Sequence, residues 1–169
     1  DTNQWKSVTW REVSNTVHQA ANALVTLGVK EEENIGIFSQ NKPECLYADF
    51  AGHANRTVSV PLYATSSAAQ AQYIVDDAQI RFLFVGEQDQ YEVASSILGL
   101  CPSLEKLILF DRKIQKNERD TTSIYFDEFL QMGEGLPNVA VVAERTARAS
   151  TDDLANILYT SGTTGESKG

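Results

Sequence analysis

The stretch FLFV, residues 82–85, decides the fold. All four side chains are apolar, so a strand formed here is hydrophobic on both faces. Such strands are typical of parallel sheets that are covered by helices. A helical pattern precedes the run, because apolar residues recur at intervals of three and four at Ala71, Ile74, Val75 and Ala78. The stretch therefore predicts a helix that leads into a buried parallel strand.

The same alternation extends along most of the chain. Further apolar runs are IGIF at 35–38, VSV at 58–60 and LILF at 107–110, and helical patterns lie between the runs at 43–54, 67–78 and 89–100. Units of strand, helix and strand imply right-handed crossovers. We therefore predict an α/β fold with a mostly parallel, doubly wound sheet flanked by helices. The units share no repeated motif, which argues against a solenoid.

The first helix carries signals at both ends. Thr9 and Glu12 form a capping-box pattern at its start, and Gly28 suits its end because glycine adopts left-handed geometry without strain. Between them one apolar face contains Trp10, Val13, Val17, Ala20, Ala21, Leu24 and Leu27. A second helix is predicted from Pro43, a residue favoured in the first turn, and its residues Leu46, Phe50 and Ala54 share a face.

The remaining elements complete one domain over residues 1–169. YFDEFL at 125–130 predicts a short helix, and residues 139–149 predict another, although VAVVA within them also fits a strand. ANILYT at 155–160 predicts the last strand, which leads directly into a loop rich in Gly, Ser and Thr.

Composition limits the partners. The chain has 169 residues, of which 42% are hydrophobic, with a formal net charge of −9. Such a charge repels a nucleic-acid backbone, so we expect no nucleic-acid partner, and the basic stretch at 106–119 is interpreted as a solvated loop. No apolar run approaches the ~20 residues of a membrane-spanning helix.

Location is predicted from three further observations. The opening residues DTNQWKSV lack both an initiator Met and a signal-peptide pattern, and Cys45 and Cys101 fit no zinc or redox spacing. We therefore expect a reduced, cytoplasmic setting, with peripheral contact to a membrane left open.

The final loop has the chemistry of a phosphate-binding site. Gly162 and Gly165 allow tight turns with exposed N–H groups, and a cluster of hydroxyls surrounds them. A positive charge follows at Lys168. Convergent N–H groups, hydroxyls and an ammonium after a buried strand suit a chain of phosphates. The predicted binding residues are Thr160, Ser161, Gly162, Thr163, Thr164, Gly165, Glu166, Ser167 and Lys168.

Other phosphate and nucleophile motifs do not fit this loop. Counted from Gly162, the Walker pattern requires Gly and Ser or Thr where Ser167 and Gly169 stand. The loop is not the G-x-G-x-x-G fingerprint, and Ser161 does not lie in a G-x-S-x-G elbow. A flexible linker is also disfavoured, because the loop directly follows the apolar NILY.

ILYTSGTTGESKG, residues 157–169, resembles the phosphate-binding signature of the adenylate-forming superfamily, with Ser167 where Pro is commonest. The resemblance extends over essentially the whole chain. VSVPLYATSS and DDLANILYTSGTTGE resemble the long-chain fatty acid–CoA ligases in particular, although Cys45 stands where these enzymes usually have Trp.

The resemblance implies a two-step reaction of the complete enzyme. A fatty acid carboxylate and ATP with Mg²⁺ give an acyl-adenylate and pyrophosphate, and CoA then releases AMP and forms the thioester. In the family the adenine and ribose contacts, the metal-binding Glu, the acyl pocket and the catalytic Lys lie downstream of this loop. We therefore expect the chain to be an N-terminal portion with no catalytic residues, inactive alone and prone to self-associate through uncovered faces.

Two alternatives stay open at this point. One is another acid–thiol ligase or acyl-carrier-protein ligase of the superfamily, and the other is a non-catalytic phosphate- or nucleotide-binding α/β module. Other conspicuous residues have simpler interpretations. Asp76, Asp77, Asp152 and Asp153 are predicted to be solvated turn or helix-end residues, Trp5 and Trp10 to be packing residues, and His18 and His53 to have no catalytic role.

Overall fold

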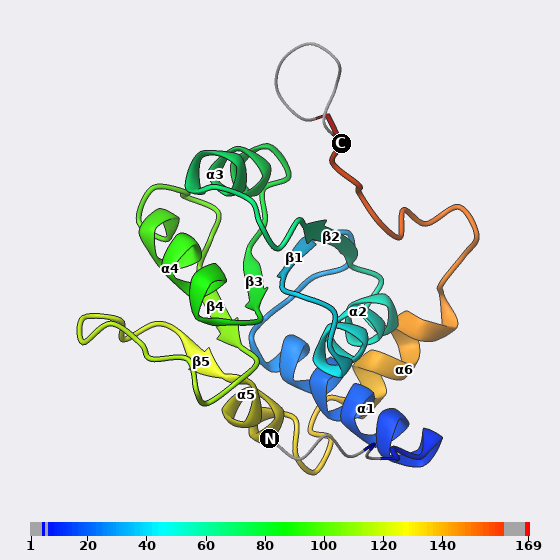
Figure 1. The fold of residues 1–169 in the computed structure, drawn as a ribbon. Coiled ribbons are helices and arrows are strands. Elements are labelled where there is room, and N and C mark those ends of the chain that lie inside the picture. Colours follow the sequence, from blue (N-terminus) through cyan, green and yellow to red (C-terminus); the bar gives the residue numbers. More distant parts are fainter. Residues whose placement is uncertain (1–4, 6, 161–167) are drawn as a thin grey trace.

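A computed structural model describes residues 5, 7–160 and 168–169 of the 169-residue chain. Helices and strands alternate along it as far as residue 109 (Figure 1). In chain order the elements are α1 (Trp10–Thr26), β1 (Asn34–Phe38), α2 (Pro43–Ala54), β2 (Val58–Leu62), α3 (Ala68–Asp77), β3 (Phe82–Val85), α4 (Gln88–Ile97), β4 (Lys106–Leu109), β5 (Ile124–Tyr125), α5 (Phe126–Met132) and α6 (Val139–Ala147).

The strands of the described residues form one five-stranded sheet in the order β2-β1-β3-β4-β5, and every pair is parallel. The centre of the sheet is the pairing of β1 with β3, in which Ile35 lies opposite Phe82 and Phe38 opposite Val85. The four predicted strands over 35–110 are confirmed. The sequence did not predict β5, because two residues are too short to show a period.

Helices cover both faces of the sheet. On one face α3 and α4 pack against Leu83 and Val85, and on the other α1, α2, α5 and α6 surround Phe82 and Phe84. All four side chains of β3 are buried, as their apolar character predicted. The predicted doubly wound α/β architecture is confirmed.

The first helix has the predicted caps. The Thr9 hydroxyl accepts the Glu12 N–H at 3.3 Å, and the Glu12 carboxylate accepts the Thr9 N–H at 2.7 Å. Gly28 follows the helix with φ +80°, in the left-handed region that only glycine adopts easily. Residues close together in the sequence therefore determine where α1 begins and ends.

The prediction that both tryptophans are packing residues was wrong. Trp5 is fully exposed and Trp10 is 81% exposed, whereas the buried residues of α1 are confined to Ala20–Leu24. The apolar face of α1 is longer than the surface that α2, α5 and α6 cover. Helical periodicity shows that a face exists, but the neighbouring helices determine how much of it is buried.

Helix α2 turns its larger apolar residues outward. Its buried positions are Ala48, Ala51 and Gly52, whereas Leu46 and Phe50, which share a face, are 40% and 42% exposed. The small residues allow α2 to lie close to α1 and β1. An apolar surface is left on the outside.

The predicted strand over 155–160 was wrong in extent. Ser59 of β2 donates its N–H to the Ala155 carbonyl at 2.9 Å and accepts the Ile157 N–H at 3.0 Å, and this is an isolated parallel bridge. The next donor on that edge of β2 would be residue 61, which is proline and has no N–H. The ladder therefore cannot continue, although alternating burial persists at Ile157, Leu158 and Tyr159.

Two further helices were predicted with nearly correct bounds. The helical interpretation of 139–149 is confirmed by α6 and the strand interpretation of VAVVA is excluded, while the short helix predicted at 125–130 is α5. Most differences at element ends are one to three residues, within the usual variation of helix boundaries.

Gly133, at the end of α5, provides a test of the packing of α5 on α1. A Cβ on Gly133 would lie 1.9 Å from the Gln19 carbonyl oxygen and 2.9 Å from the Ala23 nitrogen, and neither backbone atom can move without shifting α1. We expect Gly133→Ala to lower the free energy of unfolding by about 1–3 kcal/mol. Gly99→Ala is the control, since nothing lies within 4 Å of its added carbon. Urea unfolding of both variants measures the difference, and equal midpoints would contradict this packing.

Candidate phosphate-binding site

Open α/β sheets bind ligands at the carboxyl ends of their strands, where the strand order reverses. In this sheet that point lies between β1 and β3. It is occupied by the chain's own charges. Lys42 Nζ lies 2.7 Å from the Glu87 carboxylate and donates to the Gly86 carbonyl at 3.1 Å, and the Gln40 N–H donates to Glu87 at 3.2 Å. A carboxylate already holds the donors in front of α2 and α4, so this point is not the preferred anion site.

The segment after α6 returns along the free edge of β2 toward the same end of the sheet. Arg56 donates to both oxygens of Asp153 at 2.7 Å, and the bridge at Ser59 follows it. Arg56 also pairs with Glu31, which in turn pairs with Arg148. These contacts fix the path of the chain into the predicted loop.

Asp153 was predicted to be a solvated turn residue; it lies in a turn and is partly exposed, but its carboxylate is paired with Arg56, so that prediction was incomplete. The pKa of Asp153 is lowered to about 2, mainly by its hydrogen bonds from Arg56 and then by the Ser150 N–H. The adjacent Asp152 is exposed, as predicted. No sequence signal distinguished the two, because the partner Arg56 is distant in the chain.

The two described ends of the predicted loop meet. Thr160 donates its N–H to the Lys168 carbonyl at 3.1 Å, and Lys168 donates its N–H to the Thr160 carbonyl at 3.2 Å. Both residues are exposed. Of the nine predicted binding residues, the structure therefore brings Thr160 and Lys168 together, while Ser161, Gly162, Thr163, Thr164, Gly165, Glu166 and Ser167 lie outside the described residues.

The paired residues Thr160 and Lys168 form the neck of the loop, together with the adjoining Tyr159 and Gly169. Sequence reasoning missed the residues that hold this neck in place. The Tyr159 hydroxyl donates to the Asp77 carboxylate at 2.5 Å, and its ring contacts Tyr73 edge to face at 6.4 Å. Asp77 was predicted to be a solvated helix-end residue; it lies at the end of α3 but has this partner, so that prediction was incomplete. The pair is separated by 82 positions, and neither local pattern nor spacing could reveal it.

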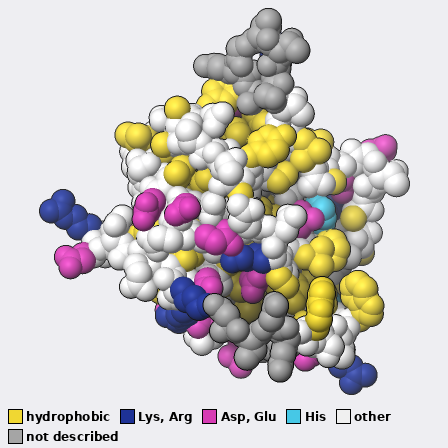
Figure 2. Space-filling model, in the orientation of Figure 1, with side chains coloured by type: hydrophobic (Ala, Val, Ile, Leu, Met, Phe, Trp, Pro, Cys, Tyr) yellow, Lys and Arg dark blue, Asp and Glu magenta, His cyan; other side chains and the backbone are white. Residues whose placement is uncertain are grey.

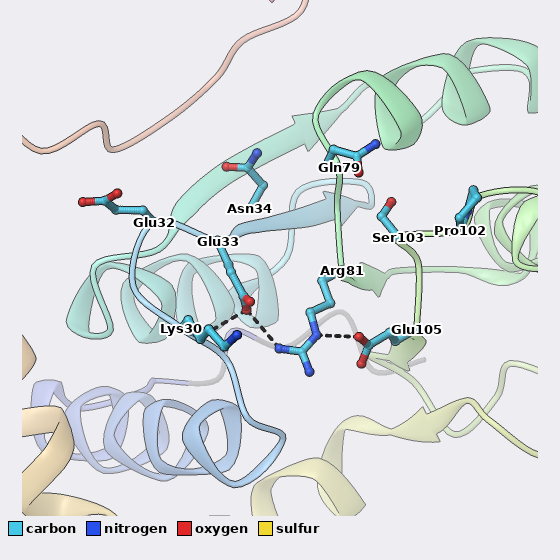
Figure 3. Close-up of a pocket in the computed structure, with 9 residues that line it drawn as sticks. All are labelled: Lys30, Glu32, Glu33, Asn34, Gln79, Arg81, Pro102, Ser103 and Glu105. Atoms are coloured by element: carbon cyan, nitrogen blue, oxygen red, sulfur yellow. Dashed lines mark hydrogen bonds and ion pairs between the residues drawn. The ribbon is translucent and has the colours of Figure 1, made fainter.

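A hollow lies at the amino-terminal ends of the strands, at the other end of the sheet from the Lys42–Glu87 pair (Figure 3). Its volume is about 480 Å³ and its lining is charged. Arg81 lies between Glu33 at 3.0 Å and Glu105 at 2.7 Å, and also donates to the Gly28 carbonyl at 2.8 Å. The charges at its centre are compensated within the chain, so the hollow is a structural junction between β1, β3 and β4.

The described part of the chain has neither a metal-binding cluster nor a membrane-spanning helix. Among those residues no cluster of three or more His, Cys, Asp or Glu side chains is placed to hold a metal ion. The helices found there are too short or too polar to span a bilayer. Cys45 and Cys101 are free thiols.

The sequence profile described as AMP-binding enzyme matches residues 2–169. The chain belongs to this family. Membership confirms the resemblance to adenylate-forming enzymes that the loop sequence indicated.

Two relatives in the family are about 30% identical to this member over the aligned residues. Long chain acyl-CoA synthetase 4 of Arabidopsis thaliana is 31% identical over 166 residues, covering 95% of this chain and 24% of that protein. Long-chain-fatty-acid–CoA ligase FadD15 of Mycobacterium bovis is 32% identical over 165 residues, covering 98% and 26%. This member of the family thus spans about a quarter of the length of these relatives.

A solved structure has the same fold. The crystal structure of the anthranilate CoA ligase AuaEII in complex with anthranoyl-AMP superposes with a TM-score of 0.81 at 25% identity, covering 96% of this chain and 29% of that one. The sheet and helices described above therefore have the same fold as the matching part of that ligase.

The Arg56–Asp153 pair gives the terminal segment a pH dependence. Asp153 has a folded pKa of about 2 against an ordinary value of 3.8, so the pair contributes stability fully above about pH 4 and loses it as the pH falls through about 2. We expect a carboxyl ¹³C titration midpoint near 2 for Asp153, rising toward 3.8 in Arg56→Gln. Arg148→Gln, which removes a different partner of Glu31, is the control. A midpoint unchanged in Arg56→Gln would refute the assignment.

Proposed function

We propose that this chain supplies the phosphate-binding loop of a long-chain fatty acid–CoA ligase. The overall reaction is ATP plus fatty acid plus CoA to acyl-CoA, AMP and pyrophosphate, through an acyl-adenylate. The supporting observation is the neck at Thr160 and Lys168, at the carboxyl edge of the sheet, in a family member whose relatives include long-chain acyl-CoA synthetases.

The loop would act on the leaving group of the first step. When the fatty acid carboxylate attacks the α-phosphate, negative charge develops on the departing β- and γ-phosphates. The loop hydroxyls, its backbone N–H groups and the Lys168 ammonium suit stabilisation of that charge. Mg²⁺ bound with ATP would neutralise part of the same charge. CoA enters only the second step, for which we assign no residue of this chain.

The chain alone is proposed to be inactive. It spans about a quarter of its relatives, and the family resemblance assigns the adenine, ribose, acyl and CoA contacts to residues beyond the loop. We assign no general acid, general base or nucleophile to residues 1–169. Their role is to position and bind the phosphates.

A second substrate class is an aromatic acid. One structural neighbour is an anthranilate CoA ligase, and the match covers 96% of this chain. The long-chain proposal is preferred because Long chain acyl-CoA synthetase 4 and FadD15 both match over nearly the whole chain at 31% and 32% identity.

Exchange of labelled pyrophosphate into ATP tests both substrate classes. We expect the longer protein that contains this chain to catalyse carboxylate-dependent exchange, with a maximum at long-chain acids. Residues 1–169 alone should give none. A maximum with anthranilate or benzoate would favour the aromatic class, and no exchange with any acid would favour a non-catalytic phosphate-binding module.

Lys168 is the residue whose loss should matter most. We expect Lys168→Ala in the longer protein to lower kcat/KM for ATP by about 100-fold, a typical effect of removing one group that stabilises transition-state charge. Lys113→Ala is the matched control, because Lys113 is an exposed lysine in the loop that follows β4. Equal losses in the two variants would contradict a specific role for Lys168.

We also propose that residues 1–169 self-associate when isolated. An apolar patch of exposed side chains covers α2, the end of β2 and the terminal segment, and Figure 2 shows hydrophobic side chains gathered on this side of the molecule. The patch consists of Leu46, Phe50, Tyr63, Leu154 and Leu158. It borders a hollow of about 500 Å³ between α2 and the terminal segment. Exposed apolar patches of this kind favour association.

Light scattering tests this proposal. We expect a mass above 18.6 kDa that rises with concentration, and a return toward the monomer mass in Leu46→Ser with Phe50→Ser. Leu100→Ser is the control, because Leu100 is 60% exposed but lies outside the patch. A monodisperse monomer at high concentration would argue against self-association.

A further inference from the structure

Tyr159 is the buried side chain of the neck. Its exposed fraction is 5%, whereas Leu158 is 64% exposed and Thr160 is exposed. The ring belongs to the core cluster that α3 and α4 form on their face of the sheet. Among residues 158–160, therefore, Tyr159 alone fastens the chain to the protein interior.

The hydroxyl of Tyr159 has a specific acceptor. It donates to Asp77 Oδ2 at 2.5 Å, while the ring lies perpendicular to that of Tyr73 at 6.4 Å. Burial, followed by the contact with Asp77, raises the pKa of Tyr159 above its ordinary value, so the group remains a donor throughout the physiological range. Two residues one turn apart on α3 thus contact one aromatic side chain.

Asp77 stands at a position that does not favour a carboxylate. It is the last residue of α3, where the negative end of the helix dipole repels an acid. The helix itself is fixed by a capping box at Ser67 and by the buried residues Ala71, Ile74 and Val75. Asp77 therefore presents an acceptor from a rigid support and does not itself stabilise that helix end.

The returning side of the neck lies against the same ring. A Cβ on Gly169 would lie 2.8 Å from Cζ of Tyr159 and 2.8 Å from Cγ2 of Ile157, so the backbone at Gly169 approaches these side chains closely. Lys168, the preceding residue, is paired with Thr160 through two backbone hydrogen bonds. Both sides of the neck are consequently held near Tyr159.

We propose that Asp77 and Tyr159 are a positioning pair, which holds Thr160 and Lys168 against α3 so that the Lys168 ammonium has a fixed place relative to the sheet. The pair contacts no substrate and acts through the neck. This inference extends the proposed function, since a fixed neck matters to catalysis only if the loop binds the phosphates of ATP. Its structural part, the attachment of the neck to α3, stands independently of that function.

Hydrogen exchange of residues 1–169 tests the attachment without any activity. We expect Asp77→Ala and Tyr159→Phe each to accelerate exchange of the Thr160 and Lys168 amides by about ten-fold, as expected for loss of a hydrogen bond to a charged group. Asp77→Asn retains an acceptor and should restore most of the protection. Tyr63→Phe is the control, because the side chain of Tyr63 is 65% exposed.

The double variant decides whether the two residues act as one unit. If they do, Asp77→Ala combined with Tyr159→Phe accelerates exchange no more than either single change. The proposal that the residues act as a pair would be overturned if the accelerations of amide exchange multiplied in the double variant. It would also be overturned if amide exchange were unchanged in the single variants.

Kinetics of the longer protein test the positioning role. We expect Asp77→Ala and Tyr159→Phe to lower kcat/KM for ATP in pyrophosphate exchange by about ten-fold, with Asp77→Asn close to the unsubstituted protein. Faster amide exchange with unchanged kinetics in an active enzyme would overturn the positioning role. If the unsubstituted protein shows no exchange activity, the proposed function fails, and amide exchange still decides the attachment.

Discussion

The pairing of β1 with β3 is the contact on which the rest of the structure depends. These two strands lie inside the sheet, and the order of the strands reverses between them. Their register, with Phe38 opposite Val85, places the starts of α2 and α4 side by side, and this proximity allows Lys42 to reach Glu87. The helices of both layers pack against the side chains of these strands. The position usually open to ligands is filled by an internal ion pair as a result.

With that position occupied, the edge of β2 becomes the place where a functional segment can be added. The chain returns there after α6, attached first by Arg56 to Asp153 and then by the bridge at Ser59. Pro61 ends the pairing after one bridge, because the proline nitrogen carries no hydrogen. The segment therefore leaves the sheet at the level of α3, where Asp77 and Tyr73 receive Tyr159.

The parts of this structure that were predictable are those encoded by neighbouring residues. The structure of three such features depends mainly on residues close together in the sequence, and each was found as predicted. They are the run FLFV at 82–85, the Thr9–Glu12 cap and Gly28. The short β5, the exposure of Trp10 and the end of the ladder at Pro61 depend on neighbours that are distant in the chain. At the candidate site the sequence indicated the phosphate-binding chemistry of the loop, but it did not indicate which residues hold the loop in place. An acid at the end of α3 gives no local indication that a tyrosine far along the chain will bind it.

The attachment of the terminal segment also has a consequence for the order of folding. Tyr159 and Asp77 are 82 positions apart, and Asp153 and Arg56 are 97 apart, whereas most sheet pairings join successive units of the chain. Closing longer loops costs more entropy, and contacts between distant positions slow folding. The sheet can therefore form before residues 153–160 dock against it. The neck would then dock as one of the last events, onto a surface that is already formed.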